Sequence, residues 1–148
     1  EMQNVVQKAG EKDLPVLAEL AVLLWNEHSV AELTQEFSQI MASADAQFFI
    51  KYDEGRAVGF AQCQLRHDYV EGTTTTPVGY LEGIFVKADC RRKGYAKELL
   101  HACEAWAKER GCREFASDCE LENEESRRFH RAMQFVEANR IVCFAKPL

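Results

Sequence analysis

The stretch VGYLEGIFVKADCRRKGYA, residues 78–96, decides the fold. Its first nine residues, Val78–Val86, are apolar on both faces of a strand, which is typical of the centre of a sheet covered on both sides. Apolar residues at helical spacing follow over Ala96–Arg110, and Gly111 ends this helix. The next apolar run, Glu114–Cys119, predicts a strand. A strand, a helix and a strand in this order indicate a parallel crossover.

The segments on either side of this crossover add antiparallel strands and further helices. Helical spacing predicts one helix after Asp13, a second at about 30–41 and a third at about 123–133, and polar residues 67–77 predict a loop. The remaining apolar runs predict strands, at 5–7, 47–52, 57–66 and 136–146. The predicted fold class is α+β (mixed α/β). It is a single layered domain over residues 1–148, with a mixed central sheet flanked by about four helices.

The charge balance limits the kind of partner. The chain has 148 residues, of which 18 are basic and 24 acidic, for a net charge of −6. A nucleic-acid binder normally carries a basic excess, so nucleic acid is not expected as a partner, whereas an acidic surface favours cationic ligands. No apolar run approaches the roughly 20 residues of a membrane span, and the first residues have no signal-peptide pattern. We therefore expect a cytoplasmic protein with no membrane partner.

The six cysteines show neither the C-x-x-C pairs of a zinc site nor the dense spacing of a disulfide framework. We interpret them as buried apolar thiols in a reducing compartment. No metal is expected.

The run Arg91–Ala96 places three cations and two small residues between the central strand and a long helix. The start of a helix has free N–H groups and the positive end of the helix dipole, and small residues let a ligand approach the backbone. The run therefore favours a phosphate group, although a solvated basic turn has the same composition. It contains neither the Gly-Lys-Ser/Thr of a P-loop nor the dinucleotide fingerprint.

Two carboxylates interrupt the apolar pattern. Glu82 lies inside the central strand, where an unpaired charge is costly to bury, and Gly83 beside it marks a bulge or a close approach of another group. Glu82 either pairs with an internal arginine or faces a cleft where it holds a cation or activates a nucleophile. Asp118 stands near the end of the next strand, in an acidic run that otherwise has the composition of a solvated helix start. A phosphate turn and an acidic cleft together indicate a transferase with an anionic donor and a cationic acceptor.

The pattern Arg91-x-x-Gly94-x-Ala96, after a strand that ends Ile84-Phe85-Val86, resembles the acetyl-CoA signature R/Q-x-x-G-x-G/A of the GNAT family of N-acetyltransferases. The late stretch around His130, Phe135 and Arg140 fits the family too, so the resemblance spans nearly the whole chain. Four pieces are similar to the aminoglycoside 6'-N-acetyltransferases within that family: Leu24-Trp25, Arg66-His67-Asp68-Tyr69-Val70, Leu81-Glu82-Gly83-Ile84-Phe85-Val86 and Ala116-Ser117-Asp118.

The resemblance implies acetyl-CoA as the co-substrate. In the family, the main chain of the central strand pairs with the pantetheine arm and the amides of the basic turn hold the pyrophosphate. The residues that it implies for this cofactor are Ile84, Phe85, Val86, Arg92, Lys93, Gly94, Tyr95, Ala96, Lys97 and Asn123.

The resemblance also implies a cationic aminoglycoside as the acceptor, in a pocket lined by Trp25, Tyr69, Glu82 and Asp118. Glu82 and Asp118 are the catalytic candidates, because a 6'-ammonium must lose a proton before it attacks a thioester. Which of the two is the base stays open.

Two positions depart from the family pattern. Asn139 stands where relatives often place an acid that touches substrate across a dimer interface, and we include it among the substrate-binding candidates. The apolar C-terminal strands imply a homodimer. His130 stands where many relatives have a tyrosine that protonates the leaving thiolate, so it is either that acid or a structural histidine.

Two other functions remain compatible with these residues. One is acetylation of a polyamine or a protein amine from the same donor site. The other is a non-catalytic acyl-CoA-binding sensor, against which Glu82 and Asp118 argue because a binder of an anion gains nothing from carboxylates nearby.

Overall fold

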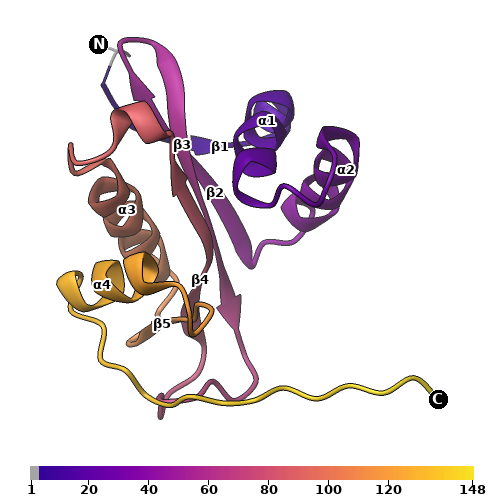
Figure 1. Ribbon diagram of the computed structural model, residues 1–148, viewed down its shortest axis with the longest axis vertical. Coiled ribbons are helices and arrows are strands. Elements are labelled where there is room, and N and C mark those ends of the chain that lie inside the picture. Colours follow the sequence, from indigo (N-terminus) through magenta and orange to yellow (C-terminus); the bar gives the residue numbers. More distant parts are fainter. Residues whose placement is uncertain (1–3) are drawn as a thin grey trace.

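The computed structural model describes residues 4–148 as one five-stranded sheet with helices on both faces (Figure 1). The strands lie in the order β1-β2-β3-β4-β5, antiparallel except for the parallel pair of β4 and β5. The strands are β1 Val6–Ala9, β2 Ala46–Asp53, β3 Arg56–Arg66, β4 Val78–Val86 and β5 Phe115–Ser117. The helices are α1 Leu14–Leu24, α2 Val30–Met41, α3 Tyr95–Glu109 and α4 Glu124–Ala132, with short 3₁₀ turns at Glu11–Asp13 and Ala88–Cys90.

The two faces of the sheet carry separate apolar cores. Figure 1 shows α1 and α2 on one face and α3 and α4 on the other. Leu17, Phe37 and Phe60 are fully buried on the α1/α2 face, and Leu99 and Cys103 are fully buried on the α3 face. Because both faces are covered, the central strands β3 and β4 are apolar on both sides. The mixed α/β fold class is confirmed.

The strands β4 and β5 separate soon after they pair. Their register contains three pairs, and the last joins Leu81 to Ser117. Beyond it, no strand of the described chain covers the β5-side edge of residues 82–86, although their other edge pairs with β3. The register against β3 shifts at the same point, so that Glu82 is an extra residue in a β-bulge. The bulge expected at Glu82 and Gly83 is therefore present, and it lies where the sheet opens.

Most predicted element boundaries agree with the structure. The segments Val30–Met41 and Val78–Val86 have the bounds expected from the sequence, and most other elements start and end within one or two residues of theirs. Polar residues 67–77 form the expected loop. No helix within residues 4–148 is long and apolar enough to cross a membrane.

The strand predicted at 136–146 is wrong. This segment leaves the body of the protein without pairing to any described strand (Figure 1), and Val136, Ile141, Val142 and Phe144 are between 69% and 91% exposed. The apolar pattern predicted a buried strand, but the segment packs on no strand or helix face within residues 4–148. Its backbone therefore has no partner there with which to form a ladder.

Candidate donor and acceptor sites

The basic turn leads into α3 through two residues with left-handed backbone conformation. Arg92 has φ +66° and Gly94, the residue before the helix, has φ +82°. A Cβ built on Gly94 would meet no atom within 4 Å, so the space in front of the helix start is open. The first N–H groups of α3, on Tyr95, Ala96 and Lys97, precede the first intrahelical bond, which runs from Glu98 to Gly94. The turn therefore has the free amides and the open approach that a pyrophosphate needs.

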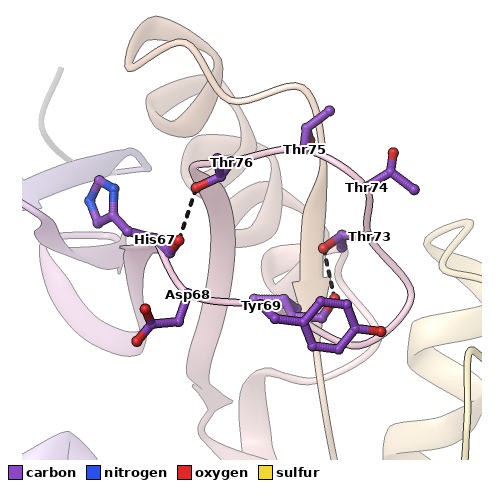
Figure 2. Close-up of a pocket in the computed structure, with 8 residues that line it drawn as sticks. His67, Asp68, Tyr69, Thr73, Thr74, Thr75 and Thr76 are labelled. Atoms are coloured by element: carbon purple, nitrogen blue, oxygen red, sulfur yellow. Dashed lines mark hydrogen bonds between the residues drawn. The ribbon is translucent and has the colours of Figure 1, made fainter.

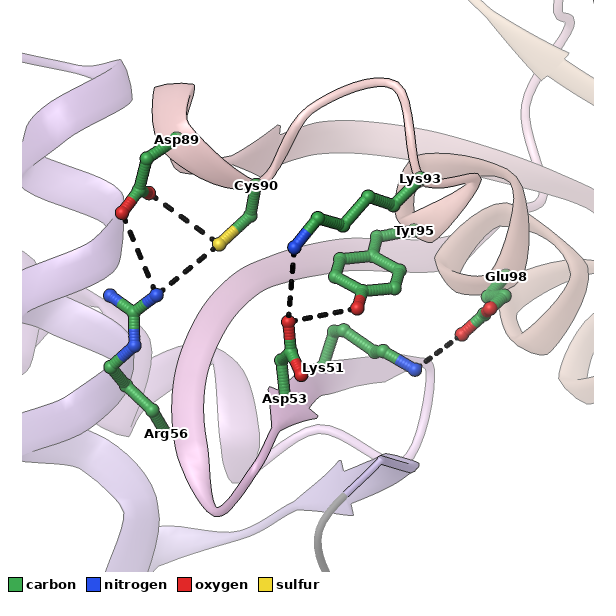
Figure 3. Close-up of polar contacts among 8 residues, drawn as sticks. All are labelled: Lys51, Asp53, Arg56, Asp89, Cys90, Lys93, Tyr95 and Glu98. Carbon is green, nitrogen blue, oxygen red and sulfur yellow. Dashed lines mark hydrogen bonds and ion pairs between the residues drawn. The ribbon is translucent and has the colours of Figure 1, made fainter.

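The tip of the β2–β3 hairpin supports this turn (Figure 3). The Tyr95 hydroxyl donates to Asp53 at 2.8 Å, and the Lys93 ammonium lies 3.6 Å from the same carboxylate. This hydrogen bond, together with burial and the charge of Asp53, raises the pKa of Tyr95 to about 12. Lys51, which is buried, pairs with Glu98 of α3 at 2.6 Å. The aromatic ring of Tyr95 thus faces the sheet, and only its amide is available to a ligand.

The remaining donor-side candidates lie around the same opening. Ile84, Phe85 and Val86 form the part of β4 whose β5-side edge is uncovered, and the Val86 carbonyl accepts from Arg91 Nε at 2.9 Å. Asn123 begins α4, and its Oδ1 accepts from the Ser126 amide at 3.0 Å, so this side chain caps the helix. The side chains of Arg92 and Lys97 are exposed beside the turn.

Glu82 is paired with Arg66, the last residue of β3. Arg66 Nη2 donates to Oε1 and Oε2 of Glu82 at 3.0 and 2.9 Å, and Nε donates to Oε2 at 3.2 Å. Burial raises the pKa of Glu82, the bonds and charge of Arg66 lower it, and the negative charge of Asp118 raises it. The internal-arginine alternative is thus correct, and the Glu82 side chain still stays 20% exposed.

Asp118 lies on the same face of the sheet and accepts a short hydrogen bond from the Tyr80 hydroxyl. Burial, followed by this bond, raises the pKa of Tyr80 well above its ordinary value, so the phenol is a donor at neutral pH. Ser117, the neighbour of Asp118, pairs with Leu81 on the α3 face. Because side chains alternate along a strand, Asp118 and Ser117 lie on opposite sides of the opening.

Trp25 approaches this cleft from the end of α1. Its ring lies so close to Gly83 that a Cβ there would come within 2.6 Å of it, which explains the glycine beside Glu82. The indole is held edge-on against Phe60 and Phe37, with centroid separations of 5.8 and 6.3 Å. The structure therefore places Trp25 next to the bulge that carries Glu82.

The loop 67–77 forms a rim with a cavity of about 290 Å³ (Figure 2). Tyr69 lies on this rim and is 76% exposed, so its ring is accessible to a ligand. Glu114 fastens the loop, since its carboxylate accepts from the amides of Thr74 and Thr75 at 3.0 and 2.9 Å and from the Thr75 hydroxyl. The cavity is lined by His67, Asp68, Tyr69, Val70, Thr73, Thr74, Thr75 and Thr76.

Asn139 reaches the same rim from the C-terminal segment. Its amide nitrogen lies 3.4 Å from Glu71, and a Cβ on Gly72 would come within 2.6 Å of Ala138. The segment beyond residue 140 then continues away from the body of the protein (Figure 1).

His130 is a residue of α4 on the other face, and its ring reaches Ser117 of β5. Its Nδ1 donates to the Ser126 carbonyl at 2.7 Å, which leaves Nε2 to accept from the Ser117 hydroxyl at 2.8 Å. These bonds fix the ring beside the end of β5. They are consistent with a structural histidine, and the role in proton transfer stays a prediction.

The known proteins similar to this chain identify its class. The family model "Acetyltransferase (GNAT) family" matches residues 15–135. The chain belongs to this family of acetyltransferases.

Within it, an aminoglycoside N(6')-acetyltransferase type 1 of Stenotrophomonas maltophilia is 38% identical over 97% of this chain and 93% of its own length. The enzyme of the same name from Acinetobacter genomosp. 13 is 42% identical over 87% of this chain and 88% of its own length. Among solved structures, AAC(6')-Iy with the bisubstrate analogue CoA-S-monomethyl-acetylneamine has a TM-score of 0.94 at 34% identity, covering 99% of both chains.

Proposed function

We propose that this protein transfers the acetyl group of acetyl-CoA to the 6'-amino group of aminoglycoside antibiotics and thereby confers resistance to them. The observation that carries the proposal is the opening between β4 and β5. On one side lies a helix start with free amides, and on the other lie the carboxylates of Glu82 and Asp118, bonded to Arg66 and Tyr80. The similarity to named aminoglycoside 6'-N-acetyltransferases over nearly the whole chain supports the same substrates.

The residues of the donor side fit acetyl-CoA. The open space at Gly94 and the amides of Tyr95 to Lys97 suit a pyrophosphate, and the uncovered edge of Ile84 to Val86 offers main-chain groups to an extended ligand. Arg92, Lys93 and Lys97 add positive charge around the turn. When bound, acetyl-CoA supplies the acetyl group as a thioester.

The acceptor side binds a cation and removes a proton. Asp118, which the hydrogen bond from Tyr80 holds in position, pairs with an ammonium of the aminoglycoside. Trp25, Tyr69 and Asn139 contact the sugar rings. Glu82 takes the proton of the 6'-ammonium through a water molecule, which leaves a neutral amine able to attack the thioester carbonyl. Transfer of the acetyl group then gives an amide and CoA.

A thiol-release assay with kanamycin, spermidine and a mixed peptide pool separates the candidate functions. We expect release of CoA with kanamycin only, and an acetyl group on the 6'-nitrogen of the product by NMR. Turnover of spermidine or peptides instead would favour the polyamine or protein-amine alternative. Binding of acetyl-CoA without turnover of any amine would favour the sensor.

We further infer that two copies form a homodimer through the C-terminal segments. Exposed Ile141, Val142 and Phe144 lie on a segment that nothing within residues 4–148 covers, and a second copy is a natural partner for such an apolar segment. The segment leaves the body at Asn139, beside the acceptor loop, so pairing there would also complete the acceptor pocket. Removal of the residues after Arg140 should abolish both the dimer in light scattering and aminoglycoside binding. A fully active monomer at micromolar concentration would contradict this.

We infer that residues 1–148 act as a single acetyltransferase domain, and that this domain works in the cytoplasm. One sheet joins strands from Val6 to Ser117, and all six cysteines are free thiols, as suits a reducing compartment. Fractionation of expressing cells, with activity measured in each fraction, tests the location.

A further inference from the structure

The two carboxylates of the acceptor cleft are joined by a continuous chain of contacts. Arg66 holds Glu82 through the fork of bonds described above, and its guanidinium carbon lies 3.5 Å from the centre of the Tyr80 ring. The Tyr80 hydroxyl in turn donates to Asp118. Glu82, Arg66, Tyr80 and Asp118 therefore form one unit, which we call the carboxylate bridge.

The backbone explains why these four side chains meet. Arg66 is the last residue of β3, and Tyr80 and Glu82 are two apart on β4, so the side chains of both point to the same face. Without the bulge, the register against β3 would continue unshifted past Leu81, so the bulge sets where Glu82 sits relative to the end of β3. Asp118 follows the last residue of β5, directly beyond the pair of Tyr80 with Ala116.

Burial differs along the bridge in a way that separates its parts. Tyr80 is 7% exposed and packs against Val70, Val78 and Ala116, whereas the side chain of Arg66 is 40% exposed. An arginine that stacks on a tyrosine and makes a bidentate hydrogen bond to a carboxylate loses little side-chain conformational entropy when a ligand binds to that carboxylate. Within the carboxylate bridge, Tyr80 is thus the buried residue, and Arg66 is the partly exposed residue that carries the positive charge.

We propose that Arg66 and Tyr80 are positioning residues that fix Glu82 and Asp118 relative to each other and divide their roles. Arg66 compensates the charge of Glu82, so that Asp118 is the carboxylate with uncompensated charge and receives the acceptor ammonium. Glu82, held by its fork, takes the proton. The assignment rests on the proposed function for the identity of the acceptor, but the bridge itself does not depend on it.

The charged neighbours of Glu82 determine the direction in which its pKa should change when Arg66 is replaced. From β3 it meets the cation Arg66, from the end of β5 the anion Asp118, and α1 presents the neutral ring of Trp25 beside it. Tyr80, on its own strand, stays a neutral phenol because its pKa lies well above the ordinary value. Loss of the Arg66 charge leaves burial and Asp118, both of which favour the protonated acid. Glu82 then needs a higher pH to ionise.

The first experiment compares Arg66→Gln and Arg66→Lys with the unchanged protein. For Arg66→Gln, we expect the acidic limb of kcat/KM to move up by about one to three pH units. Arg66→Lys, which keeps the charge but not the fork, should recover part of that shift. Arg128→Gln, which removes an arginine from an exposed pair with Glu124 on α4, is the matched control and should leave the profile unchanged. An unshifted profile in folded Arg66→Gln, with unchanged KM for the acceptor, overturns the role of Arg66.

The second experiment tests Tyr80. Tyr80→Phe keeps the ring under Arg66 and removes only the bond to Asp118, so KM for the aminoglycoside should rise roughly fivefold to tenfold with little change in kcat. In an Asp118→Asn background the same change should have almost no further effect, because the two act through one contact. Additive effects of the two substitutions would overturn the link between them.

A direct titration separates this inference from the proposed function. Carboxyl ¹³C NMR of glutamate-labelled protein, with Glu82→Gln used to assign the signal, follows the ionisation of Glu82 without any substrate. We expect its midpoint to rise in Arg66→Gln and to rise less in Arg66→Lys. If kanamycin is not acetylated but the midpoint moves, the function fails and the bridge stands. If kanamycin is acetylated but the midpoint does not move, the bridge fails; should Arg66→Gln not fold, Arg66→Lys alone decides by the same midpoint.

Discussion

The donor turn and the acceptor cleft lie on one sheet but are built in opposite ways. The donor turn uses the backbone of one continuous segment, from Val86 through Gly94 to the first turn of α3. The acceptor cleft uses side chains from α1, β3, β4 and the end of β5, which meet only in the folded sheet. A backbone site depends on conformation and open space, whereas a side-chain site depends on each functional group. The two regions should therefore respond to different kinds of substitution.

The largest effect is expected from removing charge in the acceptor cleft. Glu82→Gln and Asp118→Asn should each lower kcat/KM for the aminoglycoside by about tenfold to a hundredfold, because each removes a charge-assisted contact of about 1.5–3 kcal/mol. Affinity for acetyl-CoA, measured by calorimetry, should hardly change. Asp118→Asn should act mainly on KM and Glu82→Gln mainly on kcat.

The variants Glu82→Gln and Asp118→Asn also test whether the donor turn and the acceptor cleft are separate sites. If both keep the kinetics of the unchanged protein, the acidic cleft is not the acceptor site. If instead they weaken acetyl-CoA binding, the two regions are not separate.

A change of backbone shape should have the converse effect. Gly94→Val should weaken acetyl-CoA binding about tenfold or more, because a β-branched residue is strained at φ +82° and its side chain would fill the space in front of the helix start. The KM for the aminoglycoside should stay nearly constant. Gly111→Val is the matched control, since Gly111 has φ +88°, equally open surroundings, and lies past the other end of α3. Calorimetry on both variants decides: equal affinities would place the pyrophosphate elsewhere.

The donor turn could be predicted from the sequence more completely than the acceptor cleft. The strand Val78–Val86, the basic turn and α3 are encoded by local patterns, and their bounds and order could be predicted. The sequence predicted an internal arginine as one alternative for Glu82 but did not assign it to Arg66, and it predicted no role for Tyr80, because these contacts depend on the register of β3 against β4 and on the bulge at Glu82. For Tyr80 the usable signal was its position two residues before Glu82 on the same strand.

The C-terminal segment shows a different limit of prediction. Ile141, Val142 and Phe144 have the composition of a buried strand, and composition indicates that such residues avoid water without indicating what covers them. Within residues 4–148 no strand or helix covers them. The pattern of one chain does not identify what such residues pack against.

A smaller effect is expected where side chains only support the donor turn. Tyr95→Phe and Asp53→Ala remove the bond between α3 and the hairpin tip and should weaken acetyl-CoA binding about threefold to fivefold, less than Gly94→Val. Because the pKa of Tyr95 is raised to about 12, its phenol is protonated throughout the neutral range, and this contribution should not vary between pH 6 and about pH 10. Calorimetry at both pH values tests this. A loss as large as that of Gly94→Val would mean that side chains, not the backbone, dominate the donor site.

The smallest effect on aminoglycoside binding is expected from Glu114, whose carboxylate holds the loop 67–77 through hydrogen bonds from Thr74 and Thr75. Hydrogen bonds from the Thr75 hydroxyl and the Thr74 and Thr75 amides lower the pKa of Glu114 below its ordinary value of 4.5. A carboxylate whose pKa is lower in the folded than in the unfolded protein stabilises the fold above the unfolded value, and that contribution is lost as pH falls through the folded value. The amides of Thr74 and Thr75, in hydrogen exchange corrected for intrinsic rates, should therefore keep their protection at and somewhat below pH 4.5 and lose it only as the pH falls further, through the lowered pKa of Glu114. Glu114→Gln should reduce this protection at neutral pH and raise KM for the aminoglycoside less than threefold, with acetyl-CoA binding unchanged. Protection that is the same at every pH in both proteins would show that the loop holds its shape without Glu114, and the rim would then belong to the backbone-built class of the donor turn.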